Sequence, residues 1–160
     1  MRLTQQANYA VRTLMYCAAR PPEEISKIPE IARTYGISET HLFKVLKILV
    51  DHGYVQTLRG RNGGIRLAYS ADRILLGEVI RAAEENFNLA ECFDASKQDC
   101  PLLNSCTFNR VLNEALVAFF SVLDQYTIAD LAEDKDKLQA LLNMGEITQA
   151  LANTAASKSQ

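Results

Sequence analysis

The sequence predicts a mainly α-helical protein with one small β-hairpin and one long helix in its second half. Two observations carry this prediction. Most apolar residues recur with the roughly 3.6-residue spacing of amphipathic helices, and one pair of short apolar runs flanks an Asn-Gly-Gly turn. The chain has 160 residues, 48% of them hydrophobic, which suits one compact core with an extension better than two large domains.

The first helix is expected to begin after Thr4, a good N-cap, and to stop before the prolines at positions 21 and 22. Cys17 lies beside its apolar stripe, and we expect this cysteine to be a small, half-buried side chain. The stripe itself consists of Ala7, Ala10, Val11, Leu14, Met15 and Ala18.

Two further helices follow with a tight connection between them. Pro29 marks the first turn of one helix and Gly36 its end, and Ser38 caps the next helix, which runs to Gly53. The second of these helices has a buried stripe of Leu42, Val45, Leu46 and Leu49. This pattern is typical of a helix-turn-helix.

Residues 54–58 and 65–68 read as two strands joined by a glycine-rich turn that carries Arg59 and Arg61. A hairpin placed directly after a helix-turn-helix indicates a winged helix. Its arginines suit a phosphate track or a narrow minor groove. The preceding helix offers Ser38, Thr40, His41 and Lys44 as candidate contacts to double-stranded DNA, whereas Phe43 either meets a thymine methyl or packs on the wing.

Charge is distributed unevenly along the chain. Residues 1–68 carry ten Lys and Arg against five Asp and Glu, a balance of +5, whereas residues 69–160 carry seven against fourteen, a balance of −7. A basic first part beside an acidic remainder indicates that the first part faces a polyanion. Scatter of charge over solvated faces is the alternative.

After a helix around residues 76–83, a long apolar periodicity indicates a helix from about Cys106 to Tyr126. Its face is too large for the small first domain to cover, so we expect a homodimer, with packing inside one chain as the alternative. The predicted organisation is a DNA-binding domain over 1–84, a cysteine loop over 85–106, a dimerisation helix over 106–131 and a variable, partly disordered tail over 132–160.

Three of the four cysteines fall within fifteen positions: Cys92, Cys100 and Cys106. A cytoplasmic chain keeps its thiols reduced, so this grouping indicates metal or cluster ligands and not disulfides. Zinc modules usually present tight Cys-x-x-Cys pairs, which this segment lacks, whereas an iron-sulfur cluster accepts wider spacing. The spacing favours a cluster, with zinc and bare redox thiols as alternatives.

Several segments resemble the Rrf2 family of winged-helix regulators. They are MRLT and YAVR at the start, IPEIARTYGIS before the second helix of the pair, RGRNGGIRL in the hairpin, and ECF, DCP and SC around the cysteines. The resemblance covers residues 1 to about 131. Within the family, the segments NYAVR, LFK and LAECF with DCPL are similar to the iron-responsive members from rhizobia.

The resemblance implies a homodimer with a [4Fe-4S] cluster in each subunit that represses iron-uptake genes when iron is plentiful. It gives the ligand role to Cys92, Cys100 and Cys106, with a [2Fe-2S] cluster as the alternative form. The fourth ligand stays open, because two relatives use an aspartate and a histidine at the positions of Asn8 and Asn109. A nitric-oxide or general redox signal is the alternative to iron.

The sequence shows no nucleotide-binding glycine loop, no catalytic His-Cys or Ser-His arrangement and no second cluster motif. We therefore expect no enzyme, and an iron-sulfur electron carrier or enzyme is the alternative from another class. No run reaches the roughly 20 apolar residues of a bilayer-crossing helix, and the first residues lack the layout of a signal peptide. The expected protein is cytoplasmic and does not bind membranes.

Overall fold

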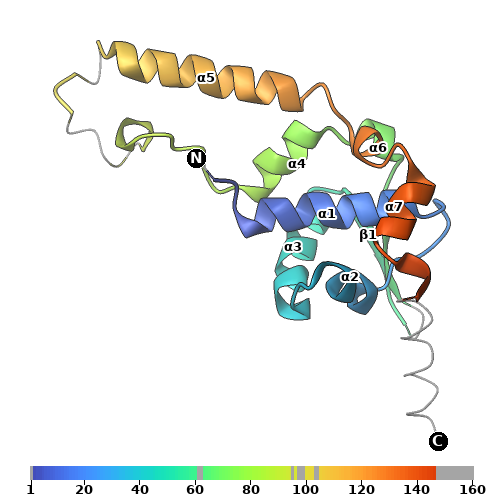
Figure 1. Ribbon diagram of the computed structural model, residues 1–160. Helices are drawn as coiled ribbons and strands as arrows, with labels where there is room; N and C mark the ends of the chain where they lie inside the picture. Colours follow the sequence, from blue (N-terminus) through green and yellow to red (C-terminus); the bar gives the residue numbers. More distant parts are fainter. Residues whose placement is uncertain (1, 61–62, 95, 97–99, 103–104, 147–160) are drawn as a thin grey trace, which may run out of the picture.

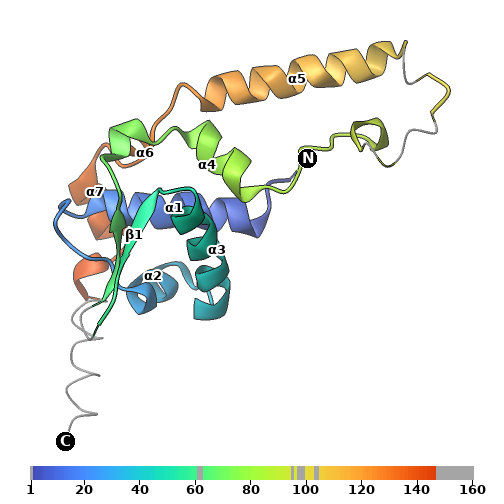
Figure 2. The same cartoon turned by 180° about the vertical axis from the view of Figure 1, so that it is seen from behind.

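The computed structural model describes residues 2–60, 63–94, 96, 100–102 and 105–146. In this part of the chain it confirms a mainly α-helical fold with one antiparallel hairpin. The central α1 has α2 and α3 on one side, and α4 and the long α5 on the other (Figures 1 and 2). The elements are α1 (Gln5–Ala19), α2 (Ile28–Tyr35), α3 (Glu39–Asp51), β1 (Val55–Leu58), β2 (Gly64–Leu67), η1 (Ala71–Arg73), α4 (Leu76–Ala83), η2 (Glu91–Phe93), α5 (Thr107–Leu123), α6 (Ile128–Leu131) and α7 (Lys135–Leu141).

The ends of the first three helices are set by the residues that the sequence marks. The Thr4 hydroxyl accepts a hydrogen bond from the Ala7 N–H at 3.2 Å, and Gly36 ends α2 with a left-handed φ of 63°. Ser38 Oγ accepts from the His41 N–H at 3.3 Å at the start of α3. Each signal acts within one turn, so it specifies the helix boundary locally.

The hairpin carries an additional short pairing on one edge. β1 and β2 pair antiparallel along their whole length, and their bounds differ from the predicted strands by one residue at one or both ends. Ser26 forms a bridge to Ile65 in β2, with N–H to carbonyl distances of 2.8 and 2.9 Å. A side chain at Gly64 would collide with the Ser26 carbonyl, so glycine allows this close backbone approach.

α1 contributes to both apolar clusters of the core. Ala7, Ala10 and Leu14 belong to the first cluster, which joins α1 to α3, β1, α4 and α6. The second cluster joins the end of α1 to α2, α3 and β2, and it includes Met144, which is 5% exposed. The two helices of the helix-turn-helix are therefore held on α1 by apolar packing.

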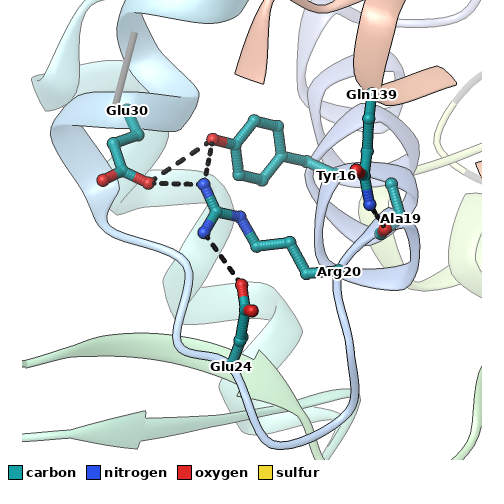
Figure 3. A network of polar contacts seen from close by, with 6 residues as sticks. All are labelled: Tyr16, Ala19, Arg20, Glu24, Glu30 and Gln139. Carbon is teal, nitrogen blue, oxygen red and sulfur yellow. Dashed lines mark hydrogen bonds and ion pairs between the residues drawn. The ribbon is translucent and has the colours of Figure 1, made fainter. Parts of the chain in front are cut away.

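A buried ionic network fixes the end of α1 against α2 (Figure 3). Arg20 Nη2 lies 2.9 Å from the Glu30 carboxylate and donates to the Tyr16 hydroxyl at 3.1 Å. Glu30 is 2% exposed, so its charge depends on this guanidinium for compensation. Gln139 of α7 donates a hydrogen bond to the Ala19 carbonyl and covers the same helix end.

The long helix ends earlier than the sequence indicates, at Leu123 and not near Tyr126. The Leu76 N–H donates to the Tyr126 carbonyl, and the Ile128 N–H donates to the Ile74 carbonyl, both at 2.9 Å. Residues 126–128 are thus held against the start of α4 and do not continue the helix. Such a long-range pairing is invisible in the local periodicity.

α4 and α5 meet at a polar and aromatic joint. Arg81 donates to both carboxylate oxygens of Asp124, at 2.8 and 2.5 Å, and its guanidinium lies 4.2 Å from the centre of the Phe120 ring. Hydrogen bonding to Arg81 lowers the pKa of Asp124. A methyl group at Gly77 would collide with the Asp124 carboxylate, so a larger residue there would have to displace Asp124 from its contact with Arg81.

Away from this joint, α5 is exposed along its length. No residue of this helix is buried, and α5 extends past α1 on the side where the chain begins (Figures 1 and 2). Phe108 is 63% exposed and Val111 is 49% exposed. Both belong to the apolar stripe of this helix, which consists of Phe108, Val111, Leu112, Ala115, Leu116, Phe119 and Leu123. In this single chain the apolar stripe of α5 is therefore exposed, as is typical of an interaction surface.

The region after α5 packs back on the body of the protein. α6 begins with a capping box between Thr127 and Asp130, and α7 lies beside α1. The expected disordered end of the tail lies in residues 147–160, outside the described residues. No helix in the described part of the chain is long and apolar enough to span a membrane.

Candidate DNA interface and cysteine site

The first turns of α3 present the polar residues expected to contact DNA. Leu42, Val45 and Leu46 face the core, which turns Thr40 and Lys44 outward, and both are exposed. His41 is exposed as well, and Ser38 caps the helix with its hydroxyl. The positive end of a helix dipole and several hydrogen-bond donors thus lie together on one surface.

The hairpin places Arg59 at the end of β1, where it is exposed. Gly60 follows with a φ of 114°, a backbone conformation that side chains disfavour. Arg61, the second predicted wing contact, lies outside the described residues. Neither Lys44 nor Arg59 has an ion-pair partner within the described part of the chain, whereas Lys47 is paired with Asp51 at 2.6 Å.

An apolar groove of about 560 Å³ separates α3 from the hairpin. Phe43, which is 57% exposed, lines it together with Leu58 and Gly60. Phe43 therefore forms part of the wall of the groove between α3 and the hairpin. This position is compatible with both roles considered for Phe43, because a groove-facing ring can contact a thymine methyl as well as the wing.

Two of the three clustered cysteines converge at the start of α5. Cys106 is the N-cap of this helix, and its sulfur accepts a hydrogen bond from the Asn109 N–H at 3.4 Å. Cys92 lies in η2, and its sulfur accepts from Asn109 Nδ2 at 3.1 Å. Both sulfurs thus contact a single residue, although fourteen positions separate them in the chain.

Cys100 lies between them in sequence and is exposed. Among the residues that the structure describes, no three His, Cys, Asp or Glu side chains already surround a common point that could hold a metal ion. The fold therefore gathers two of the predicted ligands and leaves the third outside the pair. Asn8, at the position of another family ligand, is exposed on α1.

The donor set fits an iron-sulfur cluster. Thiolates are the usual protein ligands of such clusters, and hydrogen bonds to their sulfurs tune them. Cys92 and Cys106 each accept such a bond, and the α5 N-terminus provides a positive partial charge next to Cys106.

Cys17 has a different environment. It is 7% exposed and belongs to the second apolar cluster, and burial raises its pKa to about 12. The expected half-buried side chain is instead fully part of the core, because α2, α3 and β2 pack over the end of α1.

The hydrogen bonds of Asn109 and Asn113 near the cysteines are not predicted by the sequence analysis, where Asn109 is only the position of a relative's ligand. Their spacing contains a usable signal. Asn109 follows Cys106 by three residues and Asn113 follows Asn109 by four, so the three positions lie along one side of an α-helix.

A helix-turn-helix with an exposed second helix beside a glycine-rich hairpin defines a winged-helix DNA-binding protein. More specifically, the chain belongs to the Rrf2 family, whose model is described as an iron-dependent transcriptional regulator and matches residues 3–134. This family consists of regulators and not enzymes, as the sequence indicates.

Curated relatives agree with this assignment. The chain is 53% identical over 146 residues to the protein aau3 of Rhizobium meliloti (strain 1021), covering 91% of this chain and 94% of that protein. It is 48% identical over 146 residues to the HTH-type transcriptional regulator NsrR of Bacillus subtilis (strain 168), covering 91% and 100%.

Solved structures show the same fold. T. potens IscR matches with a TM-score of 0.67 at 24% identity, over 87% of this chain and 91% of that one. CymR, the global cysteine regulator of B. subtilis, matches with a TM-score of 0.63 at 24% identity, over 83% and 97%.

Proposed function

We propose that this protein is a cytoplasmic transcription repressor whose affinity for DNA depends on an iron-sulfur cluster, and that it represses iron-uptake genes when iron is sufficient. The observation that carries the proposal is the meeting of Cys92 and Cys106 at Asn109, in a winged-helix chain of an iron-dependent family. The wide spacing of the cysteines, without a Cys-x-x-Cys pair, supports a cluster over zinc.

Cys92, Cys100 and Cys106 are the proposed ligands, and [4Fe-4S] is the proposed form, ahead of [2Fe-2S]. When bound, the cluster supplies sensitivity to iron supply and to oxidants. The protein itself supplies the positions of the ligands. The α5 N-terminus and Asn109 would hold the sulfurs of Cys106 and Cys92 in place, and the exposed Cys100 would be the third ligand.

On the DNA side, Ser38, Thr40, His41 and Lys44 are proposed to enter the major groove, because recognition helices contact bases chiefly through their first turns. Arg59 and Arg61 are proposed to follow phosphates or a narrow minor groove. Phosphate contacts position the protein and base contacts specify the sequence, so the two sets have distinct effects on binding.

A second copy of the chain is the proposed cover for the apolar stripe of α5. α4 meets α5 through Phe120 and Asp124, whereas Phe108, Val111 and Ala115 remain exposed on another side of the helix. A homodimer joined there presents two recognition helices to a palindromic operator. Such helices must lie roughly 34–36 Å apart to enter successive major grooves.

The proposed switch follows from the position of the cysteines between α4 and α5. Ligation by Cys92, Cys100 and Cys106 would tie η2 to the start of α5, and so would constrain how the DNA-binding domain is placed relative to the dimer helix. A change of angle at the Arg81–Asp124 joint then alters the spacing of the two wings. The shift in DNA affinity is limited to the difference in cluster affinity between the two arrangements.

The test is anaerobic purification with iron and sulfide analysis, followed by DNA titrations of holo-protein, chelator-stripped protein and Cys100→Ala on one operator duplex. We expect tight binding by the holo-protein alone. Equal affinity of all three proteins would show that the cluster does not control DNA binding. A purified protein that contains zinc but no iron or sulfide would show that the cysteines bind a structural metal.

A nitric-oxide or redox sensor with the same cluster is the second candidate. It is favoured by the 48% identity to a relative named NsrR, since the family resemblance includes nitric-oxide-sensing repressors. The two candidates differ in their signal. An iron sensor releases its operator when a chelator lowers free iron, whereas a nitric-oxide sensor releases it on stoichiometric exposure to nitric oxide while iron remains plentiful.

A further inference from the structure

Asn109 and Asn113 form a short hydrogen-bonded chain that ends at the cysteines. Asn109 donates from its side chain to Cys92 Sγ at 3.1 Å and from its backbone N–H to Cys106 Sγ at 3.4 Å. One residue thereby connects η2, which contains Cys92, to the first turn of α5, which directly follows Cys106.

Asn113 fixes which way the Asn109 amide points. Its Nδ2 donates to Asn109 Oδ1 at 2.9 Å and to the Asn109 carbonyl at 3.0 Å. An amide nitrogen can only donate, so it selects the oxygen side of Asn109 and leaves the NH₂ group for the sulfur of Cys92. The rotamer and orientation of Asn109 are therefore determined by the next turn of the same helix.

We propose that Asn109 is a positioning residue that holds the Cys92 and Cys106 sulfurs together as a hydrogen-bond donor, with Asn113 orienting it, and that it is not itself a ligand. This inference rests on the proposed function, in which these cysteines bind the cluster. The oxygen that would ligate iron is engaged by Asn113, and the nitrogen faces Cys92. Groups that orient metal ligands commonly change metal affinity by about 10- to 100-fold when they are removed.

The variants that separate these roles are Asn109→Ala, Asn109→Asp and Asn113→Ala. Glu114→Gln is the control, since Glu114 is exposed on the same helix and pairs with Arg110. Asn109→Asp keeps the size of the side chain and offers a stronger oxygen ligand, but it removes the donor to Cys92. A donor role and a ligand role therefore predict opposite effects of this substitution.

The first measurement is the rate of iron release to a chelator from anaerobically reconstituted protein. We expect Asn109→Ala and Asn109→Asp to release iron about tenfold faster than wild type. Asn113→Ala should show a smaller increase, and Glu114→Gln should match wild type. Slower release from Asn109→Asp would make Asn109 a ligand and overturn the proposal, as would wild-type rates in both Asn109 variants.

The second measurement uses the apo-protein and dibromobimane, a reagent that bridges neighbouring thiols. We expect a Cys92–Cys106 bridge in wild type and a reduced yield in both Asn109 variants. An unchanged yield would contradict positioning by Asn109. If wild type takes up no iron and sulfide, the proposed function fails, while the bridging yield still decides whether Asn109 positions the two sulfurs.

Discussion

Single residues with similar chemistry have different roles in this protein because their surroundings differ. Cys17 and Cys106 are both cysteines on or beside a helix. Cys17 lies in an apolar cluster, where burial raises its pKa to about 12, whereas Cys106 caps α5 and accepts a hydrogen bond. The local environment therefore separates a structural thiol from a candidate ligand.

Cys17 should be inert in the folded protein. At pH 8 its raised pKa keeps the thiol protonated, and 7% exposure denies access to reagents. Iodoacetamide treatment of native apo-protein, read by mass spectrometry, should label Cys92, Cys100 and Cys106 only, and Cys17 should react after urea unfolding. Labelling of Cys17 at a rate similar to the others in the native state would contradict its burial.

Lys44 and Arg59 should affect DNA binding in different ways. Arg59→Ala should weaken binding to specific and random duplexes alike and reduce the salt slope by about one unit, because its proposed contact is phosphate or groove shape. Lys44→Ala should also change base preference, by about 1–3 kcal/mol at the affected position. Binding is measured by fluorescence anisotropy across a salt series.

Lys47→Ala is the matched control for this pair of variants. Lys47 is an exposed lysine of α3, but its ammonium is already paired with Asp51 at 2.6 Å. Wild-type salt dependence in Arg59→Ala would show that the wing does not contact DNA.

At the scale of whole elements, local signals and long-range contacts determine different parts of the structure. Thr4, Gly36 and Ser38 set the helix boundaries within one turn, so the sequence alone predicts them. The end of α5 and the contact of Asn109 with Cys92 depend on segments distant in the chain, which periodicity does not report. For the same reason the clustered cysteines stand out in the sequence, whereas the hydrogen bonds between Asn109 and two of their sulfurs do not.

The joint between α4 and α5 can be tested with Gly77→Ala. The added methyl should displace Asp124 from Arg81 and so weaken this partly exposed ion pair, while alanine returns up to about 1 kcal/mol in helix propensity. The net change in unfolding free energy is expected to be small. In an Asp124→Ala background the same substitution should be stabilising.

Urea unfolding of the four proteins gives the coupling energy between Gly77 and Asp124. Because Arg81 lowers the pKa of Asp124 below its ordinary 3.8, the pair contributes at neutral pH, and its contribution is lost as the pH falls below about 4. The coupling should therefore disappear in acid. Additive effects at pH 7 would show that Gly77 and Asp124 do not interact.

At the scale of the whole molecule, α5 differs in burial from the packed body, which consists of α1–α4, the hairpin, α6 and α7. The body has two closed apolar clusters, whereas no residue of α5 is buried and its apolar stripe is open. A compact core combined with an exposed apolar surface on one helix is typical of a subunit of an oligomer.

Ala115→Glu should therefore dissociate the proposed homodimer. It places an unpaired carboxylate within the exposed apolar stripe, and desolvation of that charge should raise the dimer dissociation constant at least about tenfold. Ser121→Glu adds the same charge away from the stripe and should leave assembly unchanged. Sedimentation of each variant, with and without cluster, measures the effect, and a monomeric wild-type protein at micromolar concentration would refute the dimer.

Met144 closes the apolar cluster beneath the helix-turn-helix, although that motif is complete in sequence by residue 51. During synthesis the helix-turn-helix leaves the ribosome first. Its apolar cluster lacks Met144 until nearly one hundred further residues have been added. The match to the family ends at residue 134, before α7 and Met144. A fragment cut at that boundary would retain every residue proposed to contact DNA and would lack part of the packing that holds them in place.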